Sequence, residues 1–349
     1  MSDYVVRVND EMPRSLARTR PPERPPLRLG LVQQRWHADP LAFEQMLTEG
    51  IVLAADHGAR VVCLQELTLS PYFAITPDGA QALEIAPEPL EDGPTIAFAR
   101  RAAAESGAYV HASLYEHAER GDGLGFNTAI LVAPDGELLQ RTRKLHIPIT
   151  AGYYEDRYFR QGPAEGEGDP FPVVRLPLAT VEETADAGDD SGSGTAKAGT
   201  GTAAGAGPLA GAAEARLGLP TCWDQWFPEL ARAYSLAGAD VLIYPTAIGS
   251  EPDHPDFDTE PLWHQVIVAN GIANGTFMVA INRFGVEGPL TFYGSSFISD
   301  PYGRVLVQAP RDRPAVLVAD LDLDQRRDWL ELFPFLTTRR PDAYGTLTA

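Results

Sequence analysis

The sequence predicts an α/β protein with helices packed on the outside of its sheets. Two observations support this fold class. Short apolar runs typical of buried strands alternate with segments of helical periodicity, and both halves of the chain follow the loose order strand, helix, strand, helix, strand, hairpin. The shared order is consistent with a duplicated unit. With 349 residues, of which 44% are apolar and 22% charged, the chain is long enough to bury a sizeable core.

Residues 1–26 precede the first strand. This segment is rich in arginine and proline, so we expect a flexible tail, or alternatively an arm that binds a partner. A single domain is expected to occupy residues 27–349 and to begin with a strand at 27–33. Apolar residues at positions 41, 46, 47, 51, 52 and 55 then predict a helix from about 40 to 57.

The next elements follow in order along the chain. Apolar runs predict strands at 60–64, 109–115 and 172–178, and helical periodicity predicts a helix at 94–106. The turn sequence Pro134-Asp135-Gly136 predicts a hairpin formed by residues 126–133 and 138–144. Residues 146–168 are irregular and rich in aromatic side chains.

A low-complexity segment of Gly, Ala, Thr and Asp occupies residues 181–214. It has too few large apolar side chains to offset the entropy lost on ordering. Strand-like runs flank it on both sides, so we expect a disordered expansion of a hairpin loop within one domain. Such an insertion is tolerable because the entropy of loop closure grows slowly with length.

The second half is organised around Cys222. An apolar run at 217–221 predicts a strand that ends at this cysteine, and Pro228 and Glu229 suit the first turn of a helix. Gly238 is expected just past the end of that helix, before a strand at 239–244. Further elements are a helix at about 261–274, strands at 277–282 and 315–320, a hairpin of 294–299 and 305–308, and a C-terminal arm.

Three reactive side chains, Glu66, Lys144 and Cys222, follow or end predicted strands. The carboxyl ends of neighbouring parallel strands converge on one crevice, so these side chains could meet there. A thiol with its ordinary pKa of ~8.5 needs a base or a nearby cation to become a nucleophile, and this set would supply both. The combination suits acyl transfer. On spacing alone, a chance arrangement with a buried apolar cysteine and two solvated charges explains the pattern more simply.

Several motifs resemble the nitrilase, or carbon–nitrogen hydrolase, superfamily. Three of them occur in the family's order: LQELTLSPYF at 64–73, RKLHIPITAGYYEDRYFRQG at 143–162 and PTCWDQWFPELARAYSLAGADVLIYPTAIGSEP at 220–252. The resemblance continues in WHQVIVANGIANGTFMVAINRFG at 263–285, FYGSSFISDPYGRVL at 292–306 and RRPDAYG at 339–345. It covers about residues 27–345 apart from the insertion. Within the superfamily, CWDQWFPE and YPTAIGSEP are most similar to the branch that hydrolyses N-carbamoylputrescine.

The resemblance implies a four-layer αββα sandwich and assigns roles to individual residues. Cys222 matches the nucleophile, Glu66 the general base and Lys144 the cation that stabilises the oxyanion. Glu155 matches a second glutamate that positions the substrate and assists proton transfer. The backbone N–H of Trp223 would complete the oxyanion hole. Residues 220 and 221, Pro-Thr, depart from the family's usual aliphatic strand, and a proline removes one ladder hydrogen bond, so the placement of the nucleophile could differ slightly.

Four residues are candidates for binding the substrate. Tyr72, Phe73 and Tyr154 lie beside catalytic positions and could line the pocket or belong to the core. Glu251 could pair with an ammonium group of the substrate, or could be a solvated loop carboxylate.

The activity implied by the resemblance is hydrolysis of a linear carbamoyl or amide C–N bond by a thiol, without a cofactor. The expected substrate is a small molecule, an amine-tailed ureide such as N-carbamoylputrescine, which would yield putrescine, CO2 and ammonia in polyamine biosynthesis. An enzyme similar to β-ureidopropionase or ω-amidase is the alternative within the superfamily. A non-catalytic binding or scaffold protein with this fold is the alternative from another class. Family members associate, so we expect a homodimer or a higher homo-oligomer.

Composition bears on partners and compartment. A formal net charge of −20 disfavours nucleic acid and anionic membrane surfaces as partners, and it would suit a cationic substrate. Two cysteines, Cys63 and Cys222, cannot form a disulfide framework, which favours a reducing compartment. The sequence shows neither the ~20-residue apolar run of a membrane span nor the apolar core of a signal peptide, so a cytoplasmic protein is expected.

Other possible sites are metal-ligating clusters, the histidines, Cys63 and a glycine-rich segment. No cluster of His, Cys and Asp has metal-ligand spacing, so no metal site is expected. His146 and His264 lie near the motifs, and either could pair with Cys222 as in a thiol protease, although a structural role suits His146 better. Cys63 is expected in the core. The glycines at 121–125 precede a strand rather than a helix, which indicates a turn and not a phosphate-binding loop.

Overall fold

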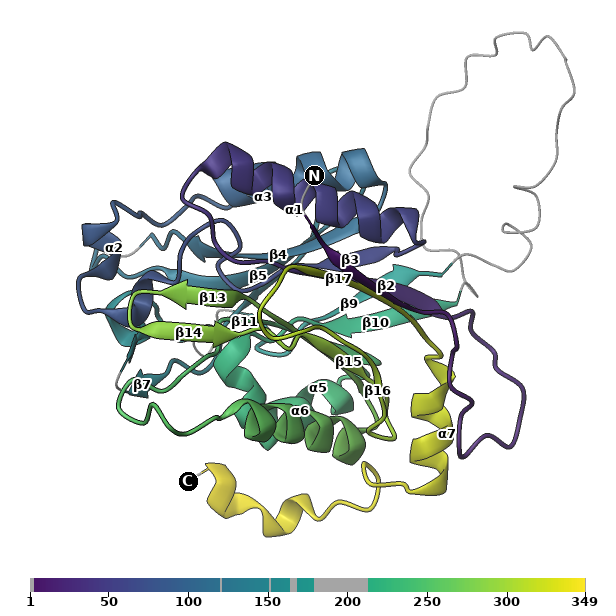
Figure 1. Cartoon of the computed structure of the whole chain (residues 1–349). Helices are drawn as coiled ribbons and strands as arrows, with labels where there is room; N and C mark the ends of the chain where they lie inside the picture. The colour runs from purple at the N-terminus through teal and green to yellow at the C-terminus, as the bar shows by residue number, and fades with distance from the viewer. Residues whose placement is uncertain (1–2, 120, 151, 164–167, 179–212, 349) are drawn as a thin grey trace, which may run out of the picture.

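Two β-sheets face each other, and helices cover their outer faces (Figure 1). The structure is a computed structural model that describes residues 3–119, 121–150, 152–163, 168–178 and 213–348. Three clusters of buried apolar side chains separate the layers. The αββα sandwich implied by the sequence is confirmed.

The first sheet has seven strands, in which β1, at one edge, pairs with β17. Strands β2, β3 and β4 run parallel to each other, whereas β17, β5 and β6 pair antiparallel with their neighbours in the rest of the sheet. In sheet order the strands are β1 (Val5–Asn9), β17 (Ala315–Leu321), β2 (Leu27–Gln33), β3 (Val61–Cys63), β4 (Tyr109–Glu116), β5 (Phe126–Val132) and β6 (Leu138–Arg143).

The second sheet has six strands. Its central strands β10, β11 and β12 are parallel, and antiparallel strands flank them on both sides. In sheet order they are β16 (Val305–Gln308), β15 (Phe297–Ser299), β12 (Phe277–Asn282), β11 (Val241–Thr246), β10 (Glu214–Gly218) and β9 (Val173–Pro177). Two short hairpins lie outside the sheets: β7 (Ile149–Thr150) with β8 (Tyr153–Tyr154), and β13 (Phe284–Glu287) with β14 (Leu290–Tyr293).

Helices form where the sequence supplies caps and breakers. Asp39 accepts hydrogen bonds from the amides of Leu41 and Ala42 at the start of α1, and Gly107 ends α3 in the left-handed region that glycine favours. Pro94 and Pro228 occupy the first turns of α3 and α5, where no amide hydrogen is needed. The α-helices are α1 (Pro40–Asp56), α2 (Gly79–Ala82), α3 (Pro94–Ser106), α5 (Pro228–Leu236), α6 (Glu260–Asn274) and α7 (Asp324–Leu332). The 3-10 turns are η1 (Phe73–Ile75), η2 (Glu155–Arg157), η3 (Cys222–Trp226), η4 (Pro341–Ala343) and η5 (Gly345–Thr348).

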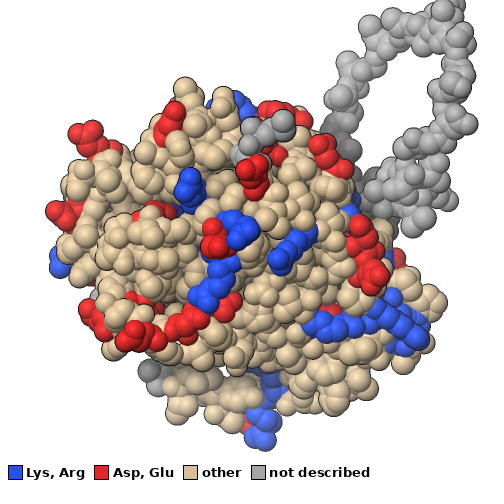
Figure 2. Space-filling view, in the orientation of Figure 1, with Lys and Arg blue, Asp and Glu red and all other residues tan. Residues whose placement is uncertain are grey.

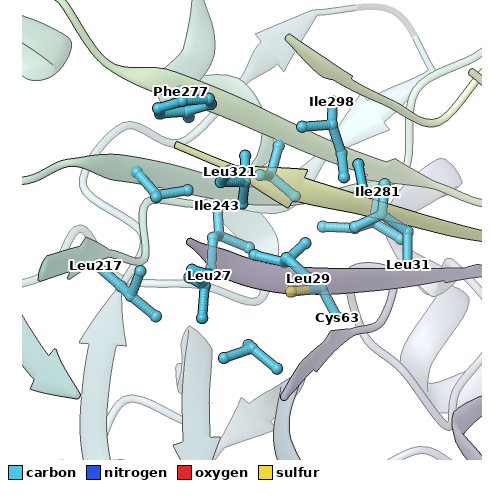
Figure 3. Packing of buried hydrophobic residues seen from close by; sticks show 14 of the residues in the cluster. Leu27, Leu29, Leu31, Cys63, Leu217, Ile243, Phe277, Ile281, Ile298 and Leu321 are labelled. Carbon is cyan, nitrogen blue, oxygen red and sulfur yellow. The ribbon is translucent and has the colours of Figure 1, made fainter. Parts of the chain in front are cut away.

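Three apolar layers hold the sandwich together. Side chains of both sheets interdigitate in the central layer, where Leu29 and Leu31 of β2 lie near Ile281 of β12 (Figure 3). A second layer packs α1 and α3 on the first sheet, and a third packs α5 and α6 on the second. Burial of this apolar area is the main favourable contribution to folding. Cys63 is fully buried in the central layer, as expected.

Most predicted elements are present with nearly the predicted limits, but β10 differs. It runs from Glu214 to Gly218 instead of 217–221, so Pro220 follows the strand and removes no ladder hydrogen bond. Residues 219–221 therefore lie between the end of β10 and the start of η3 and are not part of the strand. Helix α7 and the hairpin β13–β14 were not predicted.

The expectation of a flexible N-terminal tail at 1–26 is wrong for the described part of this segment. Residues Val5–Asn9 form β1, which pairs in parallel with β17, and Tyr4 donates a hydrogen bond from its hydroxyl to the carbonyl of Met46 in α1. Farther along, Arg18 and Arg24 form ion pairs with aspartates of the C-terminal half. The arginines that suggested a solvated tail are thus the side chains that fasten it.

The predicted disordered insertion at 181–214 falls almost entirely outside the described residues. Its two ends are described: β9 and β10 pair antiparallel, and the amide of Leu178 donates to the carbonyl of Ala213. The insertion therefore joins neighbouring strands of one sheet, as the hairpin interpretation requires.

The surface carries both signs of charge. On the face seen in Figure 2, acidic and basic side chains are scattered among uncharged ones and do not form one continuous basic surface. In the part of the chain that the structure describes, no helix is long and apolar enough to cross a membrane.

Candidate active site

The candidate residues come together at one end of the sandwich because each follows a strand or begins a turn there. Glu66 lies just beyond β3, and Lys144 directly follows β6. Glu155 is the first residue of η2, and Cys222 is the first residue of η3. The amide of Glu66 donates to the carbonyl of Thr246 at the end of β11, which joins the two sheets at this point.

Lys144 lies between the two glutamates. Its Nζ is 3.0 Å from Oε1 of Glu66 and 2.8 and 2.7 Å from Oε1 and Oε2 of Glu155. All three side chains are inaccessible to solvent. Buried charges are costly unless they are paired and hydrogen-bonded, so the ammonium group and the carboxylates depend on each other.

Neutral side chains also donate hydrogen bonds to the two carboxylates. The hydroxyl of Tyr72 donates to Oε1 of Glu155 over 2.6 Å, and the side-chain amide of Asn127 donates to Oε1 of Glu66 over 2.7 Å. Among the described residues, Oε2 of Glu66 has no hydrogen-bond partner although it is buried. This oxygen is therefore free to accept a proton from a group in the site.

Cys222 has a constrained backbone. Its φ of 41° lies in the left-handed region, which a residue with a Cβ seldom adopts and which costs about 1–3 kcal/mol. The residue is 7% exposed. The sharp turn changes the chain direction between the end of β10 and η3, and it leaves the side chain at the cavity surface. Strain of this kind is typical of functional sites.

Asp224 connects the segment that carries Cys222 to the segment that carries Lys144. Its buried carboxylate accepts hydrogen bonds from the amide of Thr221 over 3.1 Å and from the amide of His146 over 2.9 Å. Nδ1 of His146 lies 2.8 Å from the same carboxylate, and the His146 ring stacks on Phe227. His146 is therefore bound to Asp224 and does not serve as a partner of Cys222.

The electrostatics of the site follow from burial and from these charges. Burial raises the pKa of the Cys222 thiol well above its ordinary value, the charge of Glu66 raises it further, and Lys144 opposes both. Burial alone would lower the pKa of Lys144, but the charges of Glu155 and Glu66 outweigh it and raise that pKa. Burial raises the pKa of Glu155 to about 7, against the opposing effect of Lys144. The thiol is thus protonated at rest and needs a base.

A cavity of about 350 Å³ opens beside this cluster. Aromatic side chains form much of its wall, and one carboxylate other than Glu155, that of Glu251, reaches it. Burial raises the pKa of Glu251 above its ordinary value. Residues of the cavity wall include Cys222, Glu155, Tyr72, Tyr153, Trp223, Trp226 and Glu251.

The predicted substrate-binding residues divide into two groups. Tyr72 and Glu251 line the cavity, whereas Phe73 and Tyr154 are not part of its wall. Phe73 is fully buried and packs against Tyr115 and other aromatic rings, so its prediction as a pocket residue is wrong. The side chain of Tyr153, the residue before Tyr154, takes the place predicted for Tyr154, because alternate residues of β8 point to opposite sides.

Several residues of the site were missed by sequence reasoning. Asn127 was recognisable as a polar residue in the largely apolar run FNTAILV, and Asp224 lies inside the motif that contains Cys222. Trp226 lies in that motif too. Nothing local marks Glu66 as the partner of Asn127 or His146 as a partner of Asp224, because these residues lie 61 and 78 positions away.

His264 and clusters of metal-ligating side chains are the remaining candidates for a functional role. His264 contacts the ring of Phe297 and does not line the cavity. Within the described ranges, no group of three or more His, Cys, Asp or Glu side chains could hold a metal ion.

Several known proteins are similar to this chain over most of its length. A family model described as carbon–nitrogen hydrolase matches residues 28–331. N-carbamoylputrescine amidase of Arabidopsis thaliana is 33% identical over 300 residues, which are 83% of this chain and 84% of the relative. Citrullinase of Francisella tularensis is 29% identical over 328 residues, which are 92% of this chain and 98% of the relative.

A solved structure gives the same result for the fold. The crystal structure of a carbon–nitrogen hydrolase from Helicobacter pylori G27 matches with a TM-score of 0.69 and 27% identity, covering 93% of this chain and 99% of the other. The chain thus belongs to the carbon–nitrogen hydrolase family and is an amidohydrolase that acts on linear amides.

Proposed function

We propose that the protein is a thiol amidohydrolase in which Cys222 is the nucleophile, Glu66 the general base, and Lys144 and the Trp223 amide the oxyanion-binding groups. Glu155 holds Lys144 and assists proton transfer. The observation that carries the proposal is the buried ion cluster beside Cys222, in which one oxygen of Glu66 has no partner among the described residues. A protonated thiol beside a base with a free oxygen is the arrangement that nucleophilic catalysis needs.

The reaction follows from these positions. Glu66 takes the proton of the thiol, and the thiolate attacks the carbamoyl carbon. Lys144 and the amide of Trp223 stabilise the negative oxygen of the tetrahedral intermediate. Trp223 is in the first turn of η3, where amides have no acceptor within the turn. Losing one such donor costs about 3–4 kcal/mol of transition-state stabilisation.

Collapse of the intermediate releases the amine. Glu66 returns its proton to the leaving nitrogen, the C–N bond breaks, and the carbamoyl group stays on sulfur. Water, deprotonated by Glu66, then attacks the same carbon, and the C–S bond breaks as Glu66 returns this proton to the sulfur of Cys222. The carbamic acid formed decomposes to CO2 and ammonia, so one ureide and one water give one amine, CO2 and ammonia.

The walls of the cavity favour an amine-tailed substrate. Glu251 supplies a carboxylate, and Trp223 and Trp226 supply aromatic faces that attract cations. Lys144, already paired with Glu66 and Glu155, does not line the wall, and no other Lys or Arg among the described residues does. A carboxylate tail would therefore meet Glu251 without a counter-ion. This supports N-carbamoylputrescine, with a role in polyamine biosynthesis, over citrulline or a ureido acid.

Two alternatives make different predictions. An enzyme similar to β-ureidopropionase or ω-amidase would prefer a carboxylate-tailed ureide or amide. A non-catalytic scaffold would turn over no member of either class and would form no covalent adduct on Cys222. The aromatic wall and Glu251 support hydrolysis of an amine-tailed ureide over an activity similar to β-ureidopropionase or ω-amidase. The ion cluster supports an enzyme over a non-catalytic scaffold.

A substrate panel scored by ammonia release tests the proposal. N-carbamoylputrescine should be hydrolysed with a higher kcat/KM than citrulline, N-carbamoyl-β-alanine or an ω-amide. Glu251→Gln should raise KM for N-carbamoylputrescine about 10-fold, since it removes a charge-assisted hydrogen bond to the ammonium group. Asp253→Asn, an exposed carboxylate in the same loop, should leave KM unchanged. A preference for the carboxylate-tailed ureide would reject the substrate assignment.

A separate measurement tests the nucleophile. Mass spectrometry after treatment with iodoacetamide should show one modified site, Cys222, and Cys222→Ala should abolish both the adduct and turnover. Cys63 serves as an internal control because it is fully buried in the central apolar layer. If ammonia release persists in Cys222→Ala, the thiol mechanism is wrong.

A further inference from the structure

Arg283 is a buried arginine next to the site, and it has no role in the proposed reaction. It directly follows β12 of the second sheet, and its side chain is fully buried. Buried arginines are rare unless their donors are used, so its contacts indicate what it does.

The guanidinium binds the turn that follows β3. Nη2 of Arg283 donates to the carbonyl of Glu66 over 2.6 Å and to the carbonyl of Leu67 over 3.2 Å. It also lies 3.3 Å from the carbonyl of Ser70. Leu67 has a φ of 47°, so the residue after Glu66 is in the left-handed region. A leucine holds this conformation only where its surroundings enforce it.

The counter-ion of Arg283 extends the network to Tyr72. Nη1 of Arg283 is 2.9 and 3.1 Å from the two carboxylate oxygens of Glu287, on β13. Oε2 of Glu287 accepts a hydrogen bond from the amide of Tyr72 over 2.7 Å. The hydroxyl of Tyr72 in turn donates to Glu155. The ring of Phe292, on β14, packs edge-on against Tyr72.

We propose that the Arg283–Glu287 pair is a positioning device that sets both carboxylates of the site. Arg283 fixes the turn that presents Glu66, and Glu287 fixes the amide of Tyr72, whose hydroxyl orients Glu155. The inference rests on the proposed roles of Glu66 and Glu155. It assigns to the hairpin β13–β14, which belongs to neither sheet, the function of carrying one half of this pair.

Arginine is the side chain that suits this position. Its planar guanidinium presents donors in fixed directions and can bind backbone carbonyls with one nitrogen and a carboxylate with the other. A lysine would keep the charge but would offer one compact ammonium group, which cannot reach both sets of acceptors in the same geometry. The substitution Arg283→Lys therefore keeps the positive charge while it removes the fixed geometry of the hydrogen bonds.

The protein also contains a matched arginine far from the site. Arg326 of α7 is buried and donates to backbone carbonyls at the ends of α5 and α6, those of Ser235, Asn274 and Gly275. It resembles Arg283 in burial and in its carbonyl acceptors, but it touches no residue of the cavity wall. Arg326→Lys therefore reports the purely structural cost of replacing such an arginine.

The experiment compares Arg283→Lys, Glu287→Gln and Arg326→Lys in the full chain, with Glu66→Gln as a reference. The measurements are kcat and KM against pH on the best substrate of the panel, the rate at which iodoacetamide alkylates Cys222, and the urea midpoint of unfolding. Arg283→Lys should lower kcat about 10- to 100-fold with a much smaller change in KM, because small misplacements of a catalytic group have effects of this size. The pH profile should shift, and alkylation should slow.

Glu287→Gln should change the same quantities in the same direction by a smaller factor, since glutamine can still accept from the Tyr72 amide. It is the informative variant if Arg283→Lys fails to fold. Arg326→Lys should lower the urea midpoint and leave the pH profile and alkylation rate at their wild-type values.

The outcomes separate the inference from the function on which it rests. If Glu66→Gln is inactive while Arg283→Lys and Glu287→Gln keep the wild-type pH profile and kcat, the positioning role is wrong. A loss confined to the urea midpoint, as for Arg326→Lys, overturns it as well. If Glu66→Gln turns over substrate normally, the proposed catalytic function fails first.

Discussion

Glu155 combines two opposing requirements in one side chain. Its ionised form binds Lys144 through both oxygens, which places the ammonium group in the site. Burial favours the neutral form and raises its pKa from 4.5 to about 7. In the unfolded chain the ordinary pKa applies, so the folded state binds the proton more tightly. The contribution of this group to stability is therefore fully present below about pH 4.5 and is lost as the pH rises through about 7.

Activity should have the opposite dependence on pH. Because the ionised carboxylate holds Lys144, we expect kcat/KM to rise as the pH increases through about 7. Glu155→Gln should lower kcat about 100-fold, in the range typical of a lost acid–base group. As the pH rises over the same interval, the wild type loses the stability that protonated Glu155 contributes, whereas Glu155→Gln does not. The free energy of unfolding of the variant should therefore increase relative to that of the wild type. Urea denaturation at several pH values, together with pH–rate profiles, measures both effects. A stability difference that does not change with pH would contradict the assignment of this pKa.

At the scale of residues, the sequence predicts which side chains take part in the site better than it predicts the directions in which side chains point. Cys222, Glu66, Lys144 and Glu155 were placed by motifs whose residue types have few other uses together. Phe73 could not be assigned correctly, because the direction of a side chain in η1 depends on how that turn packs. The same limit applies to Arg283, whose carbonyl acceptors on Glu66 and Leu67 lie more than 200 positions earlier in the chain.

At the scale of elements, the sequence predicted the helices and strands whose signals lie entirely within the element itself. Strand β12 and helix α3 have the predicted limits, since a continuous apolar run and a proline-to-glycine helix signal are local. Strand β1 was missed because its sequence, VVRVN, gains its role only from pairing with β17. The hairpin β13–β14 was missed for the same reason: its partners are Tyr72 and Arg283, not a sheet.

The hairpin β9–β10 makes a prediction about the insertion between its strands. Leu178 and Ala213 are hydrogen-bonded, and Pro177 pairs with Glu214 in register, so the chain ends on either side of 179–212 are neighbours. Replacing residues 179–212 by Asn-Gly, which favours a two-residue hairpin turn, should leave kcat within about 2-fold of the wild type. Stability should stay equal or increase, because each halving of a loop returns about 0.6 kcal/mol of closure entropy.

The measurements for this variant are ammonia release and the urea midpoint. Replacement of 179–212 by a Gly/Ser segment of equal length is the matched control, since it changes composition but not length. A large loss of turnover in the shortened variant, with an unchanged urea midpoint, would show that the insertion has a role in the reaction.

At the scale of the whole molecule, the N-terminal segment spans both sheets. Strand β1 extends the first sheet, while Asn9 donates from its side chain to the carbonyl of Leu306 in β16 of the second sheet. Arg18 pairs with Asp322 and Asp328, near and in α7. One segment thus fastens an edge of the sandwich. Association into a homodimer or higher oligomer is a separate whole-molecule expectation and stays a prediction.

Arg24 forms two ion pairs for this segment, and its removal tests what they contribute to overall stability. Its guanidinium binds Asp240 over 2.8 Å and Asp324 over 2.9 Å, and both aspartates are nearly inaccessible to solvent. Arg24→Ala leaves Asp324 with Arg327 at 3.3 Å and Asp240 with Arg326 at 4.0 Å, so the free energy of unfolding should fall by about 1.5–3 kcal/mol, the range for losing hydrogen bonds to charged groups. Arg20→Ala, which breaks an exposed pair with Glu331, should cost less than about 1 kcal/mol.

Urea denaturation followed by far-UV circular dichroism measures both losses. The kcat of the folded Arg24→Ala protein should stay near that of the wild type because the contact is remote from the cavity. Equal losses in the two variants would mean that the segment is only loosely attached, as its composition first suggested.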